Sequence, residues 1–323
     1  MNIAIFFLFG LVAASAQTPL QPGIQLFDAG KFAQAEEFFS DVAKREPANH
    51  AALYYLARSI GERDGARMQR LEERRKWIEK AVQLQPNNSD YHLWYGHALG
   101  AIALHSSKLK LIGLAGKVKH EFETAVKLDP ASVNARIALM EYYTNAPGIA
   151  GGSKEKAMQH AEAARRLNAY RGALAVADVH ASSSNWSAAE QELRKLGKTY
   201  PDSADVGVNL LVMFQNAKQF DRAFATVDSL RRVQPNEPVW LYQTGRIASV
   251  SGQQLERGEE ALKAYLKIRE ERNRTAHAFA QYRLGLVYEK QGKKDLAKQS
   301  FQAALADQPR HAEAKKGLAR AGK

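Results

Sequence analysis

The feature that most constrains the fold of this chain is a spaced pattern of small and large residues that recurs along it. The pattern is clearest at 282–309, where it marks one side of each of two predicted helices. The first helix carries Leu284, Gly285 and Tyr288, and the second carries Ala297, Phe301 and Ala304. Residues three and four apart share a helix face, so each set forms a face that the other covers. Pro309 ends the second helix, and the segment is predicted to be an antiparallel helix pair.

Copies of this helix pair follow one another through the chain. One copy carries Trp186, Ala189, Leu193, Leu196 and Pro201, and the same pattern returns 34 residues later at Phe220, Ala223, Val227, Leu230 and Pro235. Weaker copies bring the number to about eight, near 16–48, 49–87, 88–131, 132–168, 169–202, 203–236, 237–276 and 277–310. Because a pair cannot bury its apolar face alone, we expect a stacked array in which residues 311–323 cap the last face.

These residues resemble the tetratricopeptide-repeat family, a helix–turn–helix repeat of 34 residues. The resemblance covers nearly all of 17–323; the second, third, fourth and seventh copies depart from it by insertion. It implies an all-α, right-handed superhelical solenoid of helix pairs, whose first helices line a concave groove that holds an extended peptide or a partner's helix. One solenoid over 17–323 would replace the two domains that the length suggests. The insertions look like those of uncharacterised exported bacterial repeat proteins.

The N-terminus indicates export. Residues 3–14 are an uncharged apolar run, followed by Ala14-Ser15-Ala16 and then by polar residues. The run is shorter than the about 20 residues that a spanning helix needs, so residues 1–16 are predicted to be a cleavable signal peptide. No Lys or Arg precedes the run, and the alternative is a buried helix of the mature fold. We expect a periplasmic or secreted protein after cleavage near Ala16.

Sequence patterns for catalysis and for metal binding are missing. The chain has no cysteine, which excludes disulfides, thiolate metal sites and a catalytic thiol. The segment 120–124, His-Glu-Phe-Glu-Thr, lacks the second histidine of a zinc motif. Residues 113–118 imitate part of a phosphate-binding loop, but Leu111 replaces its first glycine and Val118 replaces its Ser/Thr. We therefore predict a protein that is not an enzyme, with no catalytic residue, no metal and no cofactor.

Candidate partner-binding residues follow from the resemblance, because in this family the fifth and ninth residues of each first helix face the groove. They are Tyr54, Arg58, Leu93, His97, Glu141, Asp178, Tyr242, Arg246 and Tyr282. Among them the tyrosines would serve as aromatic anchors, and the charged residues Arg58, Glu141 and Arg246 would set the polarity of the partner. For each residue the alternative is ordinary packing between repeats.

Two departures from the repeat are candidates for a different contact. The insertion at 104–119 places leucines and an isoleucine among Lys108, Lys110, Lys117 and Lys119, which suits an acidic partner or a membrane surface. Alternatively, the apolar residues pack on the solenoid and the lysines are solvated. The Gly-rich loop 147–153 ends in Ser153, which can cap the next helix, and free backbone N–H groups there suit a small anion. A turn without a ligand is the alternative.

A third departure is a stripe of arginines on the second helix of the second copy. Arg67, Arg70 and Arg74 lie on one side of that helix, with Glu72 and Glu73 interleaved. Carboxylates and guanidiniums at these spacings pair along a helix surface. We expect a solvated, salt-bridged face.

The functional class that these observations favour is a non-enzymatic protein-binding or assembly scaffold, which captures a peptide or a partner helix in the groove. The net charge of +12 makes an acidic protein a suitable partner. The alternatives are an enzyme-associated or small-anion carrier that uses 147–153 and 104–119, and peripheral attachment to a membrane surface. Nucleic acid fits poorly, because export separates the chain from it and the arginine stripe holds no base-stacking aromatic residue.

Overall fold

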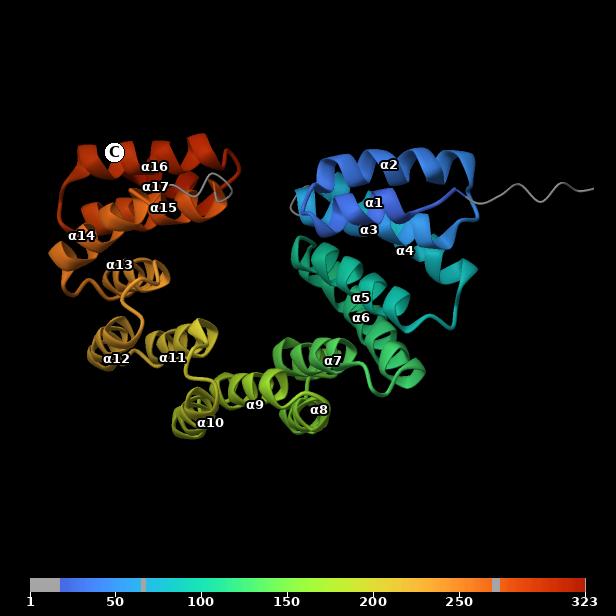
Figure 1. The fold of residues 1–323 in the computed structure, drawn as a ribbon, viewed down its shortest axis with the longest axis horizontal. Helices are drawn as coiled ribbons and strands as arrows, with labels where there is room; N and C mark the ends of the chain where they lie inside the picture. Colours follow the sequence, from blue (N-terminus) through green and yellow to red (C-terminus); the bar gives the residue numbers. More distant parts are fainter. Residues whose placement is uncertain (1–17, 65–67, 269–273, 323) are drawn as a thin grey trace, which may run out of the picture. The chain divides into compact units, whose positions relative to one another are not determined.

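A computed structural model of the chain describes residues 18–64, 68–268 and 274–322 (Figure 1). The predicted signal peptide lies outside these residues. The described residues form α-helices and one short 3-10 turn, with no β-strand, so the predicted all-α class is confirmed. They divide into two compact units: unit 1 ends at Leu167 and unit 2 begins at Asn168.

Unit 1 consists of consecutive helix pairs, in which each helix packs on the next along the chain. The short connections make the two helices of a pair antiparallel. The pairs are α1 (Gln21–Asp28) with α2 (Phe32–Arg45), α3 (His50–Asp64) with α4 (Met68–Leu84), α5 (Ser89–Leu104) with α6 (Lys108–Leu128), and α7 (Val133–Asn145) with α8 (Lys154–Leu167). The 3-10 turn η1 (Gly148–Ala150) lies between α7 and α8.

Unit 2 continues the same arrangement of pairs and ends on a single helix. The pairs are α9 (Ala169–Ser182) with α10 (Trp186–Thr199), α11 (Ala204–Asn216) with α12 (Phe220–Val233), α13 (Val239–Ser251) with α14 (Leu255–Leu266), and α15 (Arg274–Lys290) with α16 (Lys294–Asp307). The last helix, α17 (Ala312–Ala321), packs on α15 and α16 and provides the predicted cap.

Proline fixes where most of the second helices end, as predicted. Six second helices end two residues before a proline: α2, α4, α6, α10, α12 and α16, before Pro47, Pro86, Pro130, Pro201, Pro235 and Pro309. The residue before a proline is disfavoured in the helical conformation, and the proline itself has no N–H to donate. The second helix α8 has no such proline; there Asn168 starts the next helix by accepting a hydrogen bond from the Arg171 N–H at 2.9 Å.

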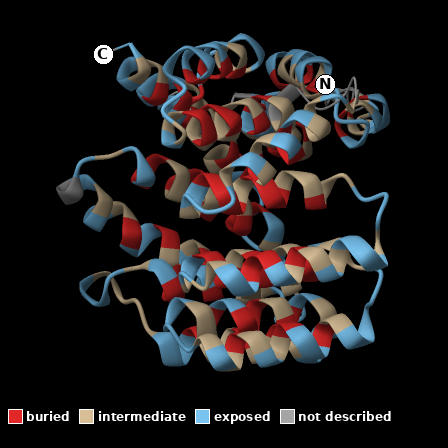
Figure 2. Cartoon of the chain, turned by 90° about the vertical axis from the view of Figure 1, so that its left-hand side faces the viewer, coloured by how far each residue is buried: buried red, intermediate tan, exposed pale blue. Residues whose placement is uncertain are grey.

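Glycines let the two helices of a pair approach closely. A Cβ atom at Gly96 would lie 2.4 Å from the Phe122 ring, and one at Gly285 would lie 2.5 Å from the Phe301 ring. Phe122 and Phe301 are themselves buried. Figure 2 shows buried residues along the inner faces of the helices, where paired and stacked helices meet. The core therefore runs from pair to pair within each unit.

The insertion of the third copy takes a form that the sequence pattern did not predict. It extends the second helix toward its N-terminus, so that α6 is 21 residues long and begins at Lys108. Gly113 and Gly116 both lie inside this helix. Their backbone remains helical because neither residue needs a left-handed conformation there.

Candidate partner-binding site

An apolar pocket of about 930 Å³ lies between α5, α6 and α7 in unit 1. Most of its lining side chains are apolar, and Arg74 reaches it from α4. The lining includes Trp94, His97, Gly100, Ala101 and Leu104 of α5; Leu111, Ala115, Val118 and Phe122 of α6; and Glu141, Tyr142 and Pro147 of α7 and the following loop. This volume lies in the range of ligand pockets, about 300–1,000 Å³.

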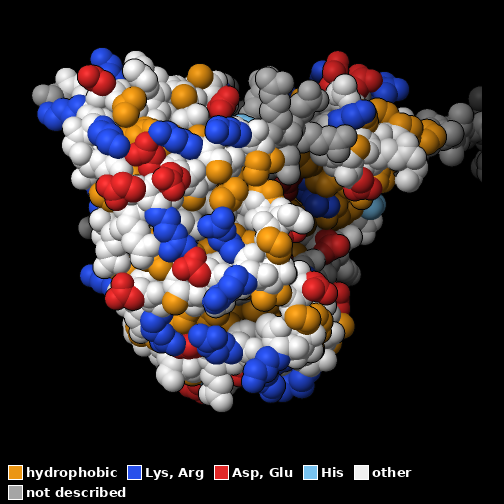
Figure 3. Space-filling model, turned by 60° about the vertical axis from the view of Figure 1, so that its left-hand side comes forward, with side chains coloured by type: hydrophobic (Ala, Val, Ile, Leu, Met, Phe, Trp, Pro, Cys, Tyr) orange, Lys and Arg blue, Asp and Glu red, His pale blue; other side chains and the backbone are white. Residues whose placement is uncertain are grey.

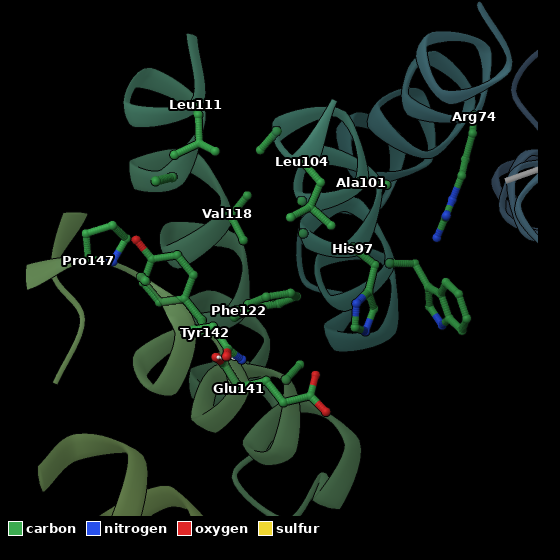
Figure 4. A pocket seen from close by; sticks show the side chains of 18 residues that line it. Arg74, His97, Ala101, Leu104, Leu111, Val118, Phe122, Glu141, Tyr142 and Pro147 are labelled. Atoms are coloured by element: carbon green, nitrogen blue, oxygen red, sulfur yellow. Dashed lines mark hydrogen bonds between the residues drawn. The ribbon is translucent and has the colours of Figure 1, made fainter. Parts of the chain in front are cut away.

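The extended N-terminal half of α6 makes one wall of the pocket. Leu111, Ala115, Val118 and Phe122 are spaced three and four apart and so share one helix face. Ala115 and Val118 are buried, whereas Ile112, on another face, is 46% exposed. In Figure 4, Leu104 and Val118 point into the same hollow from facing helices. Ala115, Val118 and the half-buried Leu111 thus pack on unit 1, as the alternative interpretation expected, whereas Leu104 and Ile112 are exposed.

Polar groups lie along one side of the pocket. Figure 4 shows Arg74, His97 and Glu141 on one side, and Leu111 and Pro147 on the other. Arg74 packs over Gly61, where an added Cβ atom would lie 2.9 Å from the guanidinium carbon. Its guanidinium carbon is 5.7 Å from the centroid of the Trp94 ring. Gly61 therefore makes the room that lets this arginine reach the pocket.

A second arginine lies next to this side of the pocket, within a cage of aromatic rings. The Arg58 guanidinium carbon is 4.4 Å from the Phe27 ring centroid and 4.5 Å from that of Trp94. Arg58 donates a hydrogen bond of 3.3 Å to the Tyr54 hydroxyl, while its buried Nε has no hydrogen-bond partner. Cation–π contacts of this kind hold a guanidinium in place without neutralising its charge.

Burial controls the protonation of the pocket's histidine. Burial lowers the pKa of His97 to about 4, and the neighbouring charge of Arg74 acts in the same direction. Burial also lowers the pKa of Arg74, with Arg58 adding to the effect and Glu62 opposing it. A guanidinium stays charged despite such a shift. Near neutral pH the side of the pocket therefore carries a neutral imidazole between a cation and the carboxylate of Glu141.

The predicted groove residues divide between the pocket and the core. His97 and Glu141 line the pocket, and Arg58 lies beside it. Leu93 is a correction: its side chain is only 3% exposed, so it packs between helices and offers no surface to a partner. Tyr54 is likewise buried, with 9% exposed.

The remaining predicted groove residues belong to unit 2. Asp178 on α9 is exposed, and Tyr242, Arg246 and Tyr282 are half-buried. The Tyr242 ring lies 5.6 Å from that of Tyr265, and the Tyr282 ring lies 4.8 Å from that of His311. These residues stay predicted contacts.

The arginine stripe is only in part the salt-bridged face that was expected. Arg70 pairs with Glu36 at 2.5 Å and also with Glu73, whereas Arg74 pairs with no described carboxylate. Arg67 lies outside the described residues. A sequence signal for this difference exists, since the residues three and four away from Arg74 are Arg70, Leu71, Trp77 and Ile78. None of these is acidic, so Arg74 has no partner on its own helix.

The Gly-rich loop uses its own backbone donors. The N–H groups of Ala150, Gly151, Gly152 and Ser153 each donate to a backbone carbonyl, at 2.8 to 3.1 Å. The expected free N–H groups are therefore absent at these four residues, which is a correction to the predicted anion site. Ser153 does cap α8, because its hydroxyl accepts from the Lys156 N–H at 3.3 Å.

The lysines of the insertion do not form one free patch. Lys110 lies 3.8 Å from a Glu72 oxygen, and Lys119 lies 3.9 Å from a Glu123 oxygen. Lys117 is exposed, and the side chain of Lys108 lies outside the described part. On the face shown in Figure 3, basic and acidic side chains likewise lie among one another. These long ion pairs at the surface contribute little to stability.

The described residues provide neither a metal site nor a membrane-spanning helix. No group of three or more His, Cys, Asp or Glu side chains could hold a metal ion. In the same part of the chain, no helix combines the length and the hydrophobicity that crossing a membrane requires.

Comparison with known proteins places this fold. Residues 282–322 match the family model for the tetratricopeptide repeat, and residues 21–143 match that of "Regulator of microtubule dynamics protein 1-3". The chain has the tetratricopeptide-repeat fold. No curated protein matches the chain as a whole or in part. The second family model spans α1 to α7 and includes most of the pocket lining.

Solved tetratricopeptide-repeat structures superpose on the chain at low identity. A tetratricopeptide repeat protein from Parabacteroides merdae matches with a TM-score of 0.56 and 16% identity, over 83% of this chain and 96% of that one. TTC0263 from Thermus thermophilus matches at 0.51 and 19%, over 61% and 97%. Yeast Tom70 matches at 0.58 and 10%, over 93% and 80%. At such identities the likeness concerns the fold alone.

Proposed function

We propose that the protein is a non-enzymatic binding scaffold that holds a peptide or a partner helix in the pocket of unit 1. The observation that carries the proposal is the pocket itself, whose apolar walls come from three successive helices. Its volume of about 930 Å³ exceeds what one side chain fills, so it suits several side chains of a segment laid across the helices. Burial of apolar surface favours such binding.

The composition of the lining favours binding over catalysis. The lining includes no Ser, Thr, Lys or Cys side chain that could act as a nucleophile. Its histidine is neutral near pH 7, with the pKa lowered to about 4, so it is a poor acid there. The Tyr142 hydroxyl is engaged, since it donates to the Ala150 carbonyl at 2.5 Å.

Site-specific photo-crosslinking tests this function. Leu104 lies at the pocket and is 81% exposed, so a photoreactive phenylalanine analogue there would reach a bound partner without filling the hollow. Val233 on α12 is similarly exposed, at 71%, and serves as the control position. We expect a discrete protein adduct from position 104 in the native cell envelope and none from position 233. Equal adduct patterns from both positions would contradict a role for the pocket.

Export is part of the same proposal. The uncharged apolar run and Ala14-Ser15-Ala16 support cleavage near Ala16 and a place in the periplasm or outside the cell. N-terminal sequencing of the protein purified from its native source should begin at Gln17. Recovery of an intact Met1 terminus from the cytoplasmic fraction would count against export.

Attachment to a membrane surface is a second candidate, which one observation favours. Ile112 and Ile149, 46% and 84% exposed, line a shallow hollow together with Lys119 and His120. Apolar side chains beside cations suit an anionic bilayer surface. The double variant Ile112→Ser/Ile149→Ser should reduce sedimentation with vesicles of anionic lipid. Unchanged sedimentation would remove this candidate and leave the scaffold proposal intact.

A further inference from the structure

Arg74 carries a charge that the fold does not neutralise. Its guanidinium lines the pocket, and the structure gives it no hydrogen bond and no ion pair with any described residue. By contrast, the half-buried carboxylate of Glu190 pairs with Arg194 at 2.7 Å and with Arg222 at 2.6 Å. A half-buried cation without a partner is unfavourable, and an incoming carboxylate relieves that cost.

Arg58 strengthens the positive potential at the same place. It lies against Trp94, the ring that Arg74 also approaches, and its only described hydrogen bond goes to the neutral Tyr54 hydroxyl. The charge of Arg58 helps to lower the pKa of Arg74, in the same direction as burial. Two acidic groups face these arginines: Glu62 acts on Arg74 from the exposed end of α3, and Glu141 lines the pocket from α7.

The apolar walls begin directly beside these cations. Trp94, Ala101 and Leu104 belong to the helix that follows Arg74 in the stack, and they continue into the wall made by α6. A ligand that reaches Arg74 with a carboxylate therefore places its adjacent groups on apolar surface. A guanidinium binds a carboxylate through two parallel hydrogen bonds, which gives this contact a defined geometry.

Resting on the proposed scaffold function, we infer that the pocket selects partner segments in which a carboxylate side chain lies next to bulky apolar side chains. The carboxylate binds Arg74, supported by Arg58, and the apolar side chains enter the hollow between α5, α6 and α7. Charge complementarity at Arg74 and Arg58 is the reason for an acidic rather than a neutral or basic segment.

Selection from a phage-displayed library of random 12-residue peptides tests this inference on the full mature chain. The wild type should enrich peptides with Asp or Glu within three residues of Phe, Trp, Leu or Ile. Arg74→Gln should keep the preference for apolar residues and lose the preference for acidic residues. Arg74→Lys should retain part of the preference for acidic residues. Gly100→Phe fills the pocket, since a Cβ atom at Gly100 meets nothing within 4 Å, and should abolish enrichment. Gly113→Phe, at an equally open glycine outside the pocket, should behave as the wild type.

A double-mutant cycle with one selected peptide measures the contact itself. Replacing its acidic residue by the amide should weaken binding to the wild type by about tenfold and binding to Arg74→Gln hardly at all. Circular dichroism establishes that each variant is folded. Enrichment of apolar peptides without acidic residues, or of basic peptides, would overturn this inference while the scaffold function stands. Enrichment equal for the wild type and Gly100→Phe would contradict the scaffold function as well.

Discussion

At the scale of single residues, the protonation of His97 makes the stability of the protein depend on pH. Its folded-state pKa of about 4 lies below the usual value of about 6.5, so the unfolded chain takes up this proton first as the pH falls. The contribution of His97 to stability is therefore complete above about pH 6.5 and is lost as the pH falls toward 4. At pH 5 the loss amounts to about 2 kcal/mol.

The measurement is urea unfolding of the wild type and of His97→Gln at pH 7 and pH 5. Between these pH values the wild type should lose about 2 kcal/mol more free energy of unfolding than the variant. The pKa of His92 is raised by its hydrogen bond with Glu121, an opposite effect that both proteins share and that cancels in the comparison. Parallel losses in the two proteins would mean that His97 is solvated in the folded state.

The same substitution at two different glycines should have opposite effects on stability. A Cβ atom at Gly245 would lie 2.2 Å from the Leu262 side chain, whereas one at Gly113 meets nothing within 4 Å. Gly245→Ala should therefore destabilise the protein by about 1–3 kcal/mol through overpacking of α13 against α14. Gly113→Ala should stabilise it by about 0.5–1 kcal/mol, because alanine has the higher helix propensity. Thermal unfolding midpoints that move in the same direction would contradict this assignment of the close contact.

At the scale of helices, α17 covers the end of unit 2. A Cβ atom at Gly317 would lie 2.6 Å from the Phe301 ring, and Leu318 packs in the same cluster. A chain that ends after His311 exposes Phe301, which is fully buried in the intact protein. We expect a loss of roughly 2–4 kcal/mol of unfolding free energy and increased binding of an apolar dye. A chain that ends after Ala321 is the control, and equal stability of the two truncations would show that α17 is no cap.

Helix pairs and their ends could be predicted from the sequence, because the signals are local. The position of Pro130 fixes the end of α6, and Gly96 marks its close contact with α5. The N-terminal extension of α6 could not be predicted in the same way. Gly113 and Gly116 have low helix propensity. The segment is held in place by an apolar face that contacts α5 and α7, and such contacts with other helices leave no local signal in the sequence.

The candidate site was predictable only in part for the same reason. The ninth positions His97 and Glu141 follow from the repeat register, and both line the pocket. Leu93 follows from the same register but is buried. The register predicts which way a side chain points, but not how far neighbouring side chains cover it. The role of Arg74 depends on Gly61 in another helix, a contact between residues that no repeat position encodes.

At the scale of the whole molecule, each unit has its own buried clusters. One cluster in unit 1 includes Phe39 and Leu53, and the clusters of unit 2 include Phe214 and Phe301. In a stacked repeat the effect of a substitution is carried mainly to neighbouring pairs. In Gly245→Leu, amide hydrogen exchange should therefore accelerate in α11 to α16 and stay unchanged in α2 to α5. Equal acceleration in all these helices would indicate a single cooperative unit.

We propose the pocket between α5, α6 and α7 as the place where a partner binds. The most direct test is the crosslink from position 104, measured in Gly100→Phe and Gly113→Phe backgrounds. Both glycines have open space around them, but only Gly100 lines the pocket. Gly100→Phe should abolish the partner adduct, and Gly113→Phe should leave it at the level of the unaltered protein. An adduct of equal yield in both backgrounds would show that the partner binds elsewhere.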